Sequence, residues 1–125
     1  PNSVSVGGAT MGHMGTTSIA ANDLVVSCSD LPSNAPGIYF YGFTPAAYPL
    51  GDGTLCIGYP NLVRLGVTQA GAGGTSSFSL DTAAMAAAGQ LEPGAVLQIQ
   101  HWYRDPSAAG AGFNFSDALQ ILFGS

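Results

Sequence analysis

Charged side chains are the scarcest feature of this chain. Asp, Glu, Lys and Arg make up 7% of its 125 residues, against about 25% in a typical soluble protein. Lysine is absent, and Arg64 and Arg104 are the only residues with a permanent positive charge. Nucleic acids and anionic lipid surfaces are bound by clusters of cations. Two arginines in a chain of net charge −5 therefore exclude both classes of partner.

Long apolar runs are also missing. No stretch approaches the roughly 20 apolar residues of a membrane span, so we expect no membrane insertion. The chain begins with Pro1 rather than Met, which we interpret as a processed product or an excised domain, and a removed signal peptide would fit. A surface with few charges loses little hydration when another surface covers it. We expect an extracellular or cell-surface protein that contacts itself, other extracellular proteins or a polysaccharide.

Cysteine occurs twice, as Cys28 and Cys56. An even pair in a lysine-free, glycine-rich chain is typical of a disulfide formed in an oxidising compartment. A bridge between these residues would stabilise the fold by about 3–4 kcal/mol in the chain-entropy model. The alternative is a pair of buried free thiols. We predict the disulfide.

Short alternating segments separated by turn-forming residues make up most of the chain. They predict one antiparallel β-sandwich domain over residues 1–125, Ig-like or jelly-roll-like, with about seven or eight strands. Asp81 and Thr82 are suited to cap one short helix near residues 82–88, which Gly89 would end. The expected strands lie in residues 1–6, 19–29, 38–43, 55–57, 62–67 and 75–80, with two more in 96–123 joined by a loop of small residues.

Two segments are expected to be irregular. Residues 7–15, GGATMGHMG, are too rich in glycine for a regular element. Residues 44–53 contain two prolines and end in an Asp52-Gly53 turn signal.

The stretch 96–123 holds the only tryptophan together with Arg104, Asp105 and Asp117. Asp105 and Asp117 bracket the same loop, which would suit the carboxylate pair of a glycosidase. Because Arg104 lies beside them, we prefer a structural ion pair, in which Arg104 meets Asp117 or Asp23. The chain has no G-x-S-x-G elbow, and neither histidine stands in a catalytic context. We expect no catalytic residues and no enzyme.

Metal binding has two possible starting points. Met11, His13 and Met14 carry ligands that suit copper. Oxygen ligands for a structural calcium ion are also present, but no consecutive calcium-loop motif contains them. These oxygen-bearing residues are Asn22, Asp23, Asp52, Asn114 and Asp117. We expect no metal and no cofactor, with calcium as the alternative.

Aromatic residues offer a route to ligand binding. Trp102 alternates with Gln98 and Gln100, so one strand face would combine a ring for stacking on a sugar with amides for hydrogen bonds. Tyr39 and Tyr41 share a face of their own strand and would extend this platform. These five residues are our candidate ligand-binding set. The alternative is that Trp102 anchors the core of the sandwich.

Four motifs suggest a family. They are AANDL at Ala20–Leu24, LCIG at Leu55–Gly58, WYRD at Trp102–Asp105 and FNFSDA at Phe113–Ala118. With them, nearly the whole chain resembles a C-terminal domain that recurs in large secreted proteins of planctomycetes and related marine or soil bacteria. The resemblance implies a secreted appendix without catalytic activity. Cys28 and the MGHMG segment depart from it.

Two functions remain open. The first is a non-catalytic structural or self-assembling subunit of a fibre, filament or array. The first expected strand, residues 1–6, would act there as an edge for strand addition. The alternative is a carbohydrate-binding accessory module of a secreted enzyme or envelope protein.

Overall fold

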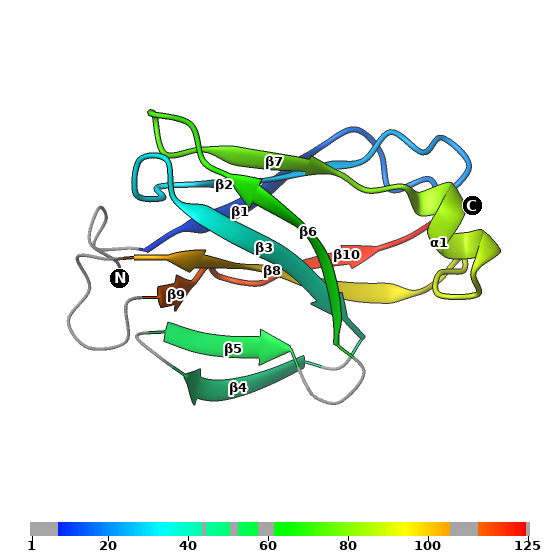
Figure 1. Cartoon of the computed structure of the whole chain (residues 1–125). Coiled ribbons are helices and arrows are strands. Elements are labelled where there is room, and N and C mark those ends of the chain that lie inside the picture. The colour runs from blue at the N-terminus through cyan, green and yellow to red at the C-terminus, as the bar shows by residue number, and fades with distance from the viewer. Residues whose placement is uncertain (1–7, 44, 51–52, 58–61, 106–112, 125) are drawn as a thin grey trace.

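The computed structural model describes residues 8–43, 45–50, 53–57, 62–105 and 113–124 (Figure 1). The predicted strand over residues 1–6 and the Asp52 turn position lie outside these residues. In chain order the elements are β1 (Thr10–Met14), β2 (Val25–Ser29), β3 (Pro36–Gly42), β4 (Pro45–Leu50), β5 (Gly53–Ile57), β6 (Val63–Gln69), β7 (Ser76–Ser79), α1 (Thr82–Ala87), β8 (Val96–Arg104), β9 (Phe113–Phe115) and β10 (Leu119–Leu122).

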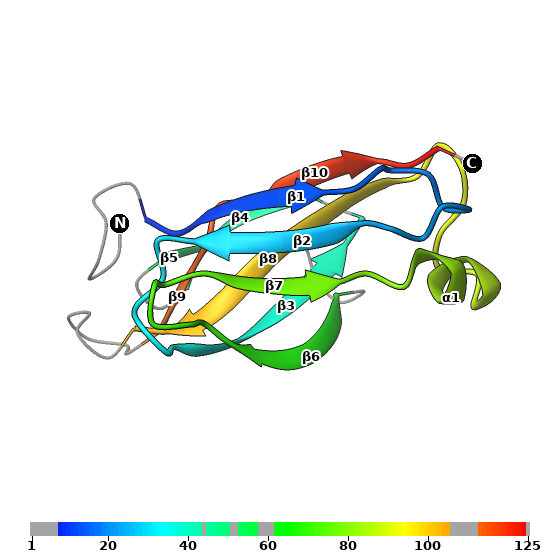
Figure 2. The same ribbon diagram turned by 90° about the horizontal axis from the view of Figure 1, so that it is seen from above.

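Two antiparallel sheets pack face to face, which confirms the predicted sandwich (Figures 1 and 2). The small sheet has the strand order β1-β2-β7, and the large sheet has the order β10-β8-β3-β6, with β9 also paired to β8. The hairpin β4–β5 is a third layer on the side of the large sheet that faces away from the small sheet (Figure 1). The large sheet is therefore covered on both faces, by different structures.

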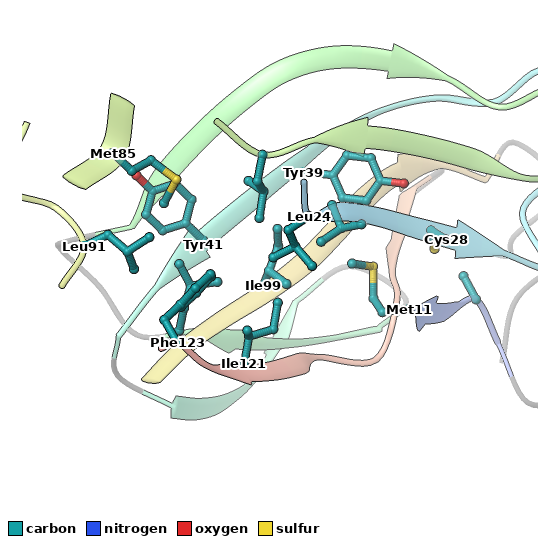
Figure 3. Close-up of a cluster of buried hydrophobic side chains, with 14 of the residues drawn as sticks. Met11, Leu24, Cys28, Tyr39, Tyr41, Met85, Leu91, Ile99, Ile121 and Phe123 are labelled. Atoms are coloured by element: carbon teal, nitrogen blue, oxygen red, sulfur yellow. The ribbon is translucent and has the colours of Figure 1, made fainter. Parts of the chain in front are cut away.

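The inner face of the large sheet, turned toward the small sheet, forms the main core. Leu97 and Ile99 of β8 and Tyr39 and Tyr41 of β3 are at most 1% exposed there. They pack against Leu24, Val26 and Cys28 from β2 and the segment before it (Figure 3). Both sheets contribute apolar residues at alternate positions, as expected when side chains of a strand point to opposite faces.

The outer face of the large sheet carries the other half of this alternation. Phe40 of β3 forms a second apolar cluster with Leu55 and Ile57 of β5. Trp102 and Phe115 pack against that cluster and are half-buried. Tyr39 and Tyr41 thus share one face of β3, as predicted, and Phe40 lies on the other.

The helix and the pairing of the first and last strands in residues 96–123 follow their predictions, but β9 is a third strand in that stretch where only two were predicted. Strand β10 pairs with β8 in antiparallel register, with Leu119 opposite Ile99. The Asp81 carboxylate accepts a hydrogen bond of 3.0 Å from the Ala84 N–H and so caps α1. Gly89 adopts a φ of 76° just beyond the helix, the left-handed conformation expected of a glycine stop. No helix among the described residues is long and apolar enough to cross a membrane.

Two segments expected to be irregular are strands, and both predictions were wrong. Residues 10–14 form β1, because β2 supplies backbone partners along its whole length and Met11 enters the core. Residues 45–50 form β4, which pairs with β5. Prolines are tolerated where a strand has a partner on one side only. By contrast, the strand predicted from residue 19 begins only at Val25, after Asn22 turns the chain with a φ of 50°.

The predicted disulfide is also wrong, because both cysteines are free. Cys28 lies in the main core on the inner side of the large sheet. Cys56 lies on β5, in the hairpin that covers the outer side. The large sheet separates the two sulfur atoms. Burial and, to a smaller extent, the Asp117 carboxylate raise the pKa of the Cys28 thiol to about 12.

Candidate functional site

A single side chain fastens the hairpin to the outer face. Gln100 is fully buried, and its Oε1 accepts a hydrogen bond of 3.0 Å from the Cys56 N–H. Its Nε2 donates to the Thr54 carbonyl at 2.8 Å and to the Ser116 carbonyl at 2.6 Å. Gln100 therefore joins β8 both to the hairpin and to the turn before β10. A buried amide with its hydrogen bonds satisfied is a structural connection.

The hairpin leaves part of the outer face open as a groove. A cavity of about 520 Å³ lies over the ends of β3 and β8. A smaller one of about 110 Å³ lies next to it, toward the hairpin. Ile38, Trp102 and Phe113 line both cavities, so the two are continuous. We call this feature the aromatic groove. It is built around Ile38, Trp102, Phe113 and Phe115, with Arg64 and Arg104 also in its lining.

The aromatic rings of the groove are ordered by contact with one another. Trp102 stacks on Phe115 with ring centroids 6.4 Å apart and planes 18° apart. Phe113 stands edge-on to Trp102 at 5.8 Å and to Phe115 at 6.1 Å. Such edge-on and stacked pairs hold aromatic rings in fixed orientations. All three rings are half-buried, so the cluster is anchored below and still reachable from solvent.

The positive charges of the chain gather at this groove. Arg64 on β6 lines the smaller cavity and Arg104 at the end of β8 lines the larger one. Both side chains are exposed. Val67, also on β6, is 74% exposed and lines the larger cavity. The groove thus combines aromatic rings, an exposed aliphatic side chain and two guanidinium groups.

The five candidate ligand-binding residues do not share one surface. Trp102 lies in the aromatic groove, whereas Gln100 lies beneath the hairpin. Gln98 is on the outer face too, but only 6% exposed. Tyr39 and Tyr41 face the main core: the Tyr39 hydroxyl lies 2.6 Å from Ser76 Oγ, and the Tyr41 hydroxyl donates to Gln90 at 3.0 Å. Burial raises the pKa of Tyr39 to about 12 and also raises the pKa of Tyr41.

The acidic residues near the closing strands have structural surroundings. Asp105 is fully buried directly after β8. The Asp117 carboxylate accepts a hydrogen bond of 2.7 Å from the Met11 N–H and so connects the two sheets. Asp23 accepts from the N–H and hydroxyl of Thr16. The ion pair of Arg104 with Asp117 or Asp23 stays a prediction.

The fold separates the three side chains that were considered as copper ligands. Met11 is buried in the main core, whereas His13 and Met14 on the same strand are exposed. Among the residues that the structure describes, no three His, Cys, Asp or Glu side chains gather in a way that could hold a metal ion. Asn22, one of the residues considered as a calcium ligand, accepts a hydrogen bond of 2.8 Å from the Thr82 N–H at the start of α1.

The buried histidine belongs to the inner face. His101 is 1% exposed, and its ring lies 4.2 Å from Tyr39 and 5.9 Å from Tyr103, measured between ring centroids. Neither ring nitrogen has a hydrogen-bond partner in the described part of the chain. Burial lowers the pKa of His101 to about 4, because the charged ring would lose its hydration. His101 is therefore neutral near pH 7.

Phe113, Phe115 and Arg64 are the groove residues that sequence reasoning missed. The spacing of Phe113 and Phe115 places both on one strand face, which was an available signal. Arg64 gave none, because only the pairing of β6 with β3 brings it opposite Phe40.

We find no match for the chain among family models, curated proteins or solved structures. A fold by itself does not define a function. The aromatic groove is the feature of the described residues that bears most directly on function.

Proposed function

We propose that this chain is a non-catalytic extracellular module that binds a glycan chain in the aromatic groove. The observation that carries the proposal is the continuous groove floored by the half-buried rings of Trp102, Phe113 and Phe115. Sugar rings present apolar faces, and these stack on exposed aromatic side chains. A groove that continues from the ends of β3 and β8 toward the hairpin suits an extended polymer better than a compact small molecule.

The surroundings of the groove support binding rather than catalysis. The acidic residues closest in sequence to Trp102 and Phe115 are Asp105, which is buried, and Asp117, which holds Met11. Within the part of the chain that the structure describes, no carboxylate lines either cavity. Retaining and inverting glycosidases both act through a pair of carboxyl groups beside the sugar.

The extracellular location rests on two supports. One is the resemblance to C-terminal domains of large secreted bacterial proteins. The other is the scarcity of charge, which suits a module that is covered by a partner or polymer. The free cysteines remove the support that a disulfide would have given.

The single tryptophan makes the proposal directly testable. Because Trp102 is the only tryptophan, its fluorescence reports on the groove alone. We expect a shift in emission when the protein is titrated with a binding polysaccharide, and no shift with monosaccharides at equal sugar concentration. Trp102→Ala and Phe113→Ala would weaken binding by about fivefold each, measured by calorimetry, because a ring-stacking contact is worth about 1 kcal/mol. No binding across neutral and acidic polymers would refute the proposal.

Self-assembly is the second candidate, and Val67 favours it. This valine is 74% exposed on β6, the edge strand of the large sheet. An exposed edge strand with an apolar side chain is a template for pairing with another chain. Under this alternative the wild type associates at high concentration in light scattering, and Val67→Lys remains monomeric. A wild type that is monomeric at every concentration would discard it.

A further inference from the structure

The distribution of charge narrows the ligand of the aromatic groove. The chain has seven acidic residues and two arginines, and both arginines line this one groove. The two belong to different strands and are 40 positions apart in sequence, since 104 − 64 = 40. The fold thus brings both arginine side chains of the chain to the aromatic groove.

The strand register places the two arginines at separate positions along the groove. Arg64 lies opposite Phe40, and Tyr103, next to Arg104, lies opposite Gly37. Arg104 is therefore displaced from Arg64 by four residues along β3 and by two strand spacings across it. At about 3.3 Å per residue and about 4.8 Å per strand, the Cα atoms are roughly 16 Å apart. The arginines suit two separate anionic groups of one extended ligand.

An anionic ligand fits the electrostatics of the remaining surface as well. With a net charge of −5, the protein repels anions elsewhere. Clefts lined by one sign of charge concentrate ligands of the opposite sign. A guanidinium group binds a carboxylate through two parallel hydrogen bonds, which a hydroxyl cannot reproduce.

We propose that the ligand of the aromatic groove is a carboxylated polysaccharide, a polymer of uronic acid residues. Its ring faces stack on Trp102 and Phe113, and carboxylates some residues apart along the polymer meet Arg64 and Arg104. This assignment rests on the proposed glycan-binding function and specifies the class of glycan. An acidic peptide would supply the carboxylates without the flat apolar faces that the rings of the groove require.

The test compares one polymer in two charge states. Polygalacturonate and its fully methyl-esterified form share a backbone, but only the first carries carboxylates. Binding is followed by Trp102 fluorescence and by calorimetry at low salt. We expect the acidic polymer to bind at least about tenfold more tightly, and this advantage to shrink as sodium chloride screens the charges. Alginate, a second polyuronate, and polyglutamate complete the panel.

Three variants assign the preference to the groove. Arg64→Gln and Arg104→Gln should each weaken polygalacturonate binding by about three- to tenfold and should weaken binding of the esterified polymer much less. The double variant should bind both forms equally. Ala83→Glu is the matched control, because it lowers the net charge by the same amount at an exposed position in the first turn of α1, where an acidic residue is tolerated. It should retain the preference.

Each of the other possible binding results contradicts a different part of the proposal. Equal binding of the acidic and esterified polymers overturns the carboxylate assignment and leaves the glycan proposal standing. A preference for acid that survives in the double arginine variant shows that the carboxylates bind outside the groove. Polyglutamate binding as tight as that of the polyuronates overturns the need for sugar rings. Absence of binding to every polymer contradicts the proposed function itself.

Discussion

The two faces of the large sheet use the same strands for different purposes. On the inner face, β8 contributes Leu97, Ile99 and His101, which are at most 1% exposed. On the outer face, the same strand contributes Gln100, locked beneath the hairpin, and Trp102, which is half-buried. The inner face is covered by a whole sheet and the outer face by a single hairpin. The candidate site exists because the hairpin covers only part of the outer face of the large sheet. The types of residue on that face matter less than this partial cover.

The largest expected effect comes from shortening an inner-face side chain. Ile99→Ala leaves a cavity between the sheets and should lower the free energy of unfolding by about 2–5 kcal/mol. Phe113→Ala on the outer face should cost clearly less, because that ring is only half-buried. Urea unfolding of both variants measures the difference. Equal losses would contradict the division between a structural face and a binding face.

Acid should destabilise the inner face through His101. Its pKa is about 4 in the folded protein and about 6.5 in the unfolded chain, so the unfolded chain binds the proton more strongly. Stability is then full above about pH 6.5 and falls by about 3 kcal/mol as the pH drops toward 4. His101→Leu should remove this part of the pH dependence, measured by urea unfolding between pH 4 and 7. An unchanged slope would show that His101 is not the responsible group.

Loosening the hairpin β4–β5 from the large sheet should lower both the stability of the fold and the affinity for ligand. Gln100→Met removes the hydrogen bonds to Cys56, Thr54 and Ser116, and should cost about 2 kcal/mol. Hydrogen exchange at the Cys56 N–H should accelerate, while exchange along β2 stays near wild type. Ligand affinity should fall, because the smaller cavity loses the wall that Leu55 provides. Unaltered exchange at Cys56 would show that Gln100 does not hold the hairpin.

The smallest expected difference between the two faces is in the reactivity of their cysteine thiols. Both should react as free thiols, and Cys56, which is half-buried, should be alkylated before Cys28. The pKa of about 12 keeps Cys28 protonated and unreactive in the folded protein. Intact mass without reductant should show two added alkyl groups after denaturation. A mass two hydrogens lower, with no uptake, would restore the disulfide that the fold excludes.

The local sequence pattern was enough to predict the capped helix and the strands in which apolar and polar residues alternate. Alternation identified the pair β8 and β10, and Asp81 with Gly89 marked the ends of α1. The errors came from residues whose usual behaviour is overridden by a neighbouring strand. Gly12 lies in β1 because β2 pairs with that segment, and Pro45 and Pro49 lie in β4 because β5 pairs with it.

The candidate site was only half predictable, because it depends on register. Trp102 was identified, but it was grouped with Tyr39 and Tyr41. The pairing of Ile38 with Trp102 places Tyr39 opposite His101, on the inner face. The disulfide prediction was wrong for a similar reason. An even number of cysteines does not reveal on which side of a sheet each sulfur atom lies.

The central claim is that ligand binds the outer face and leaves the small sheet untouched. The single indole N–H signal of Trp102 makes a ¹H–¹⁵N spectrum with polygalacturonate the most direct measurement. We expect shifts of that signal and of the amide signals of β6, β8 and β9, with the signals of β1, β2 and β7 unchanged. Shifts confined to the small sheet, with the Trp102 signal unmoved, would contradict it.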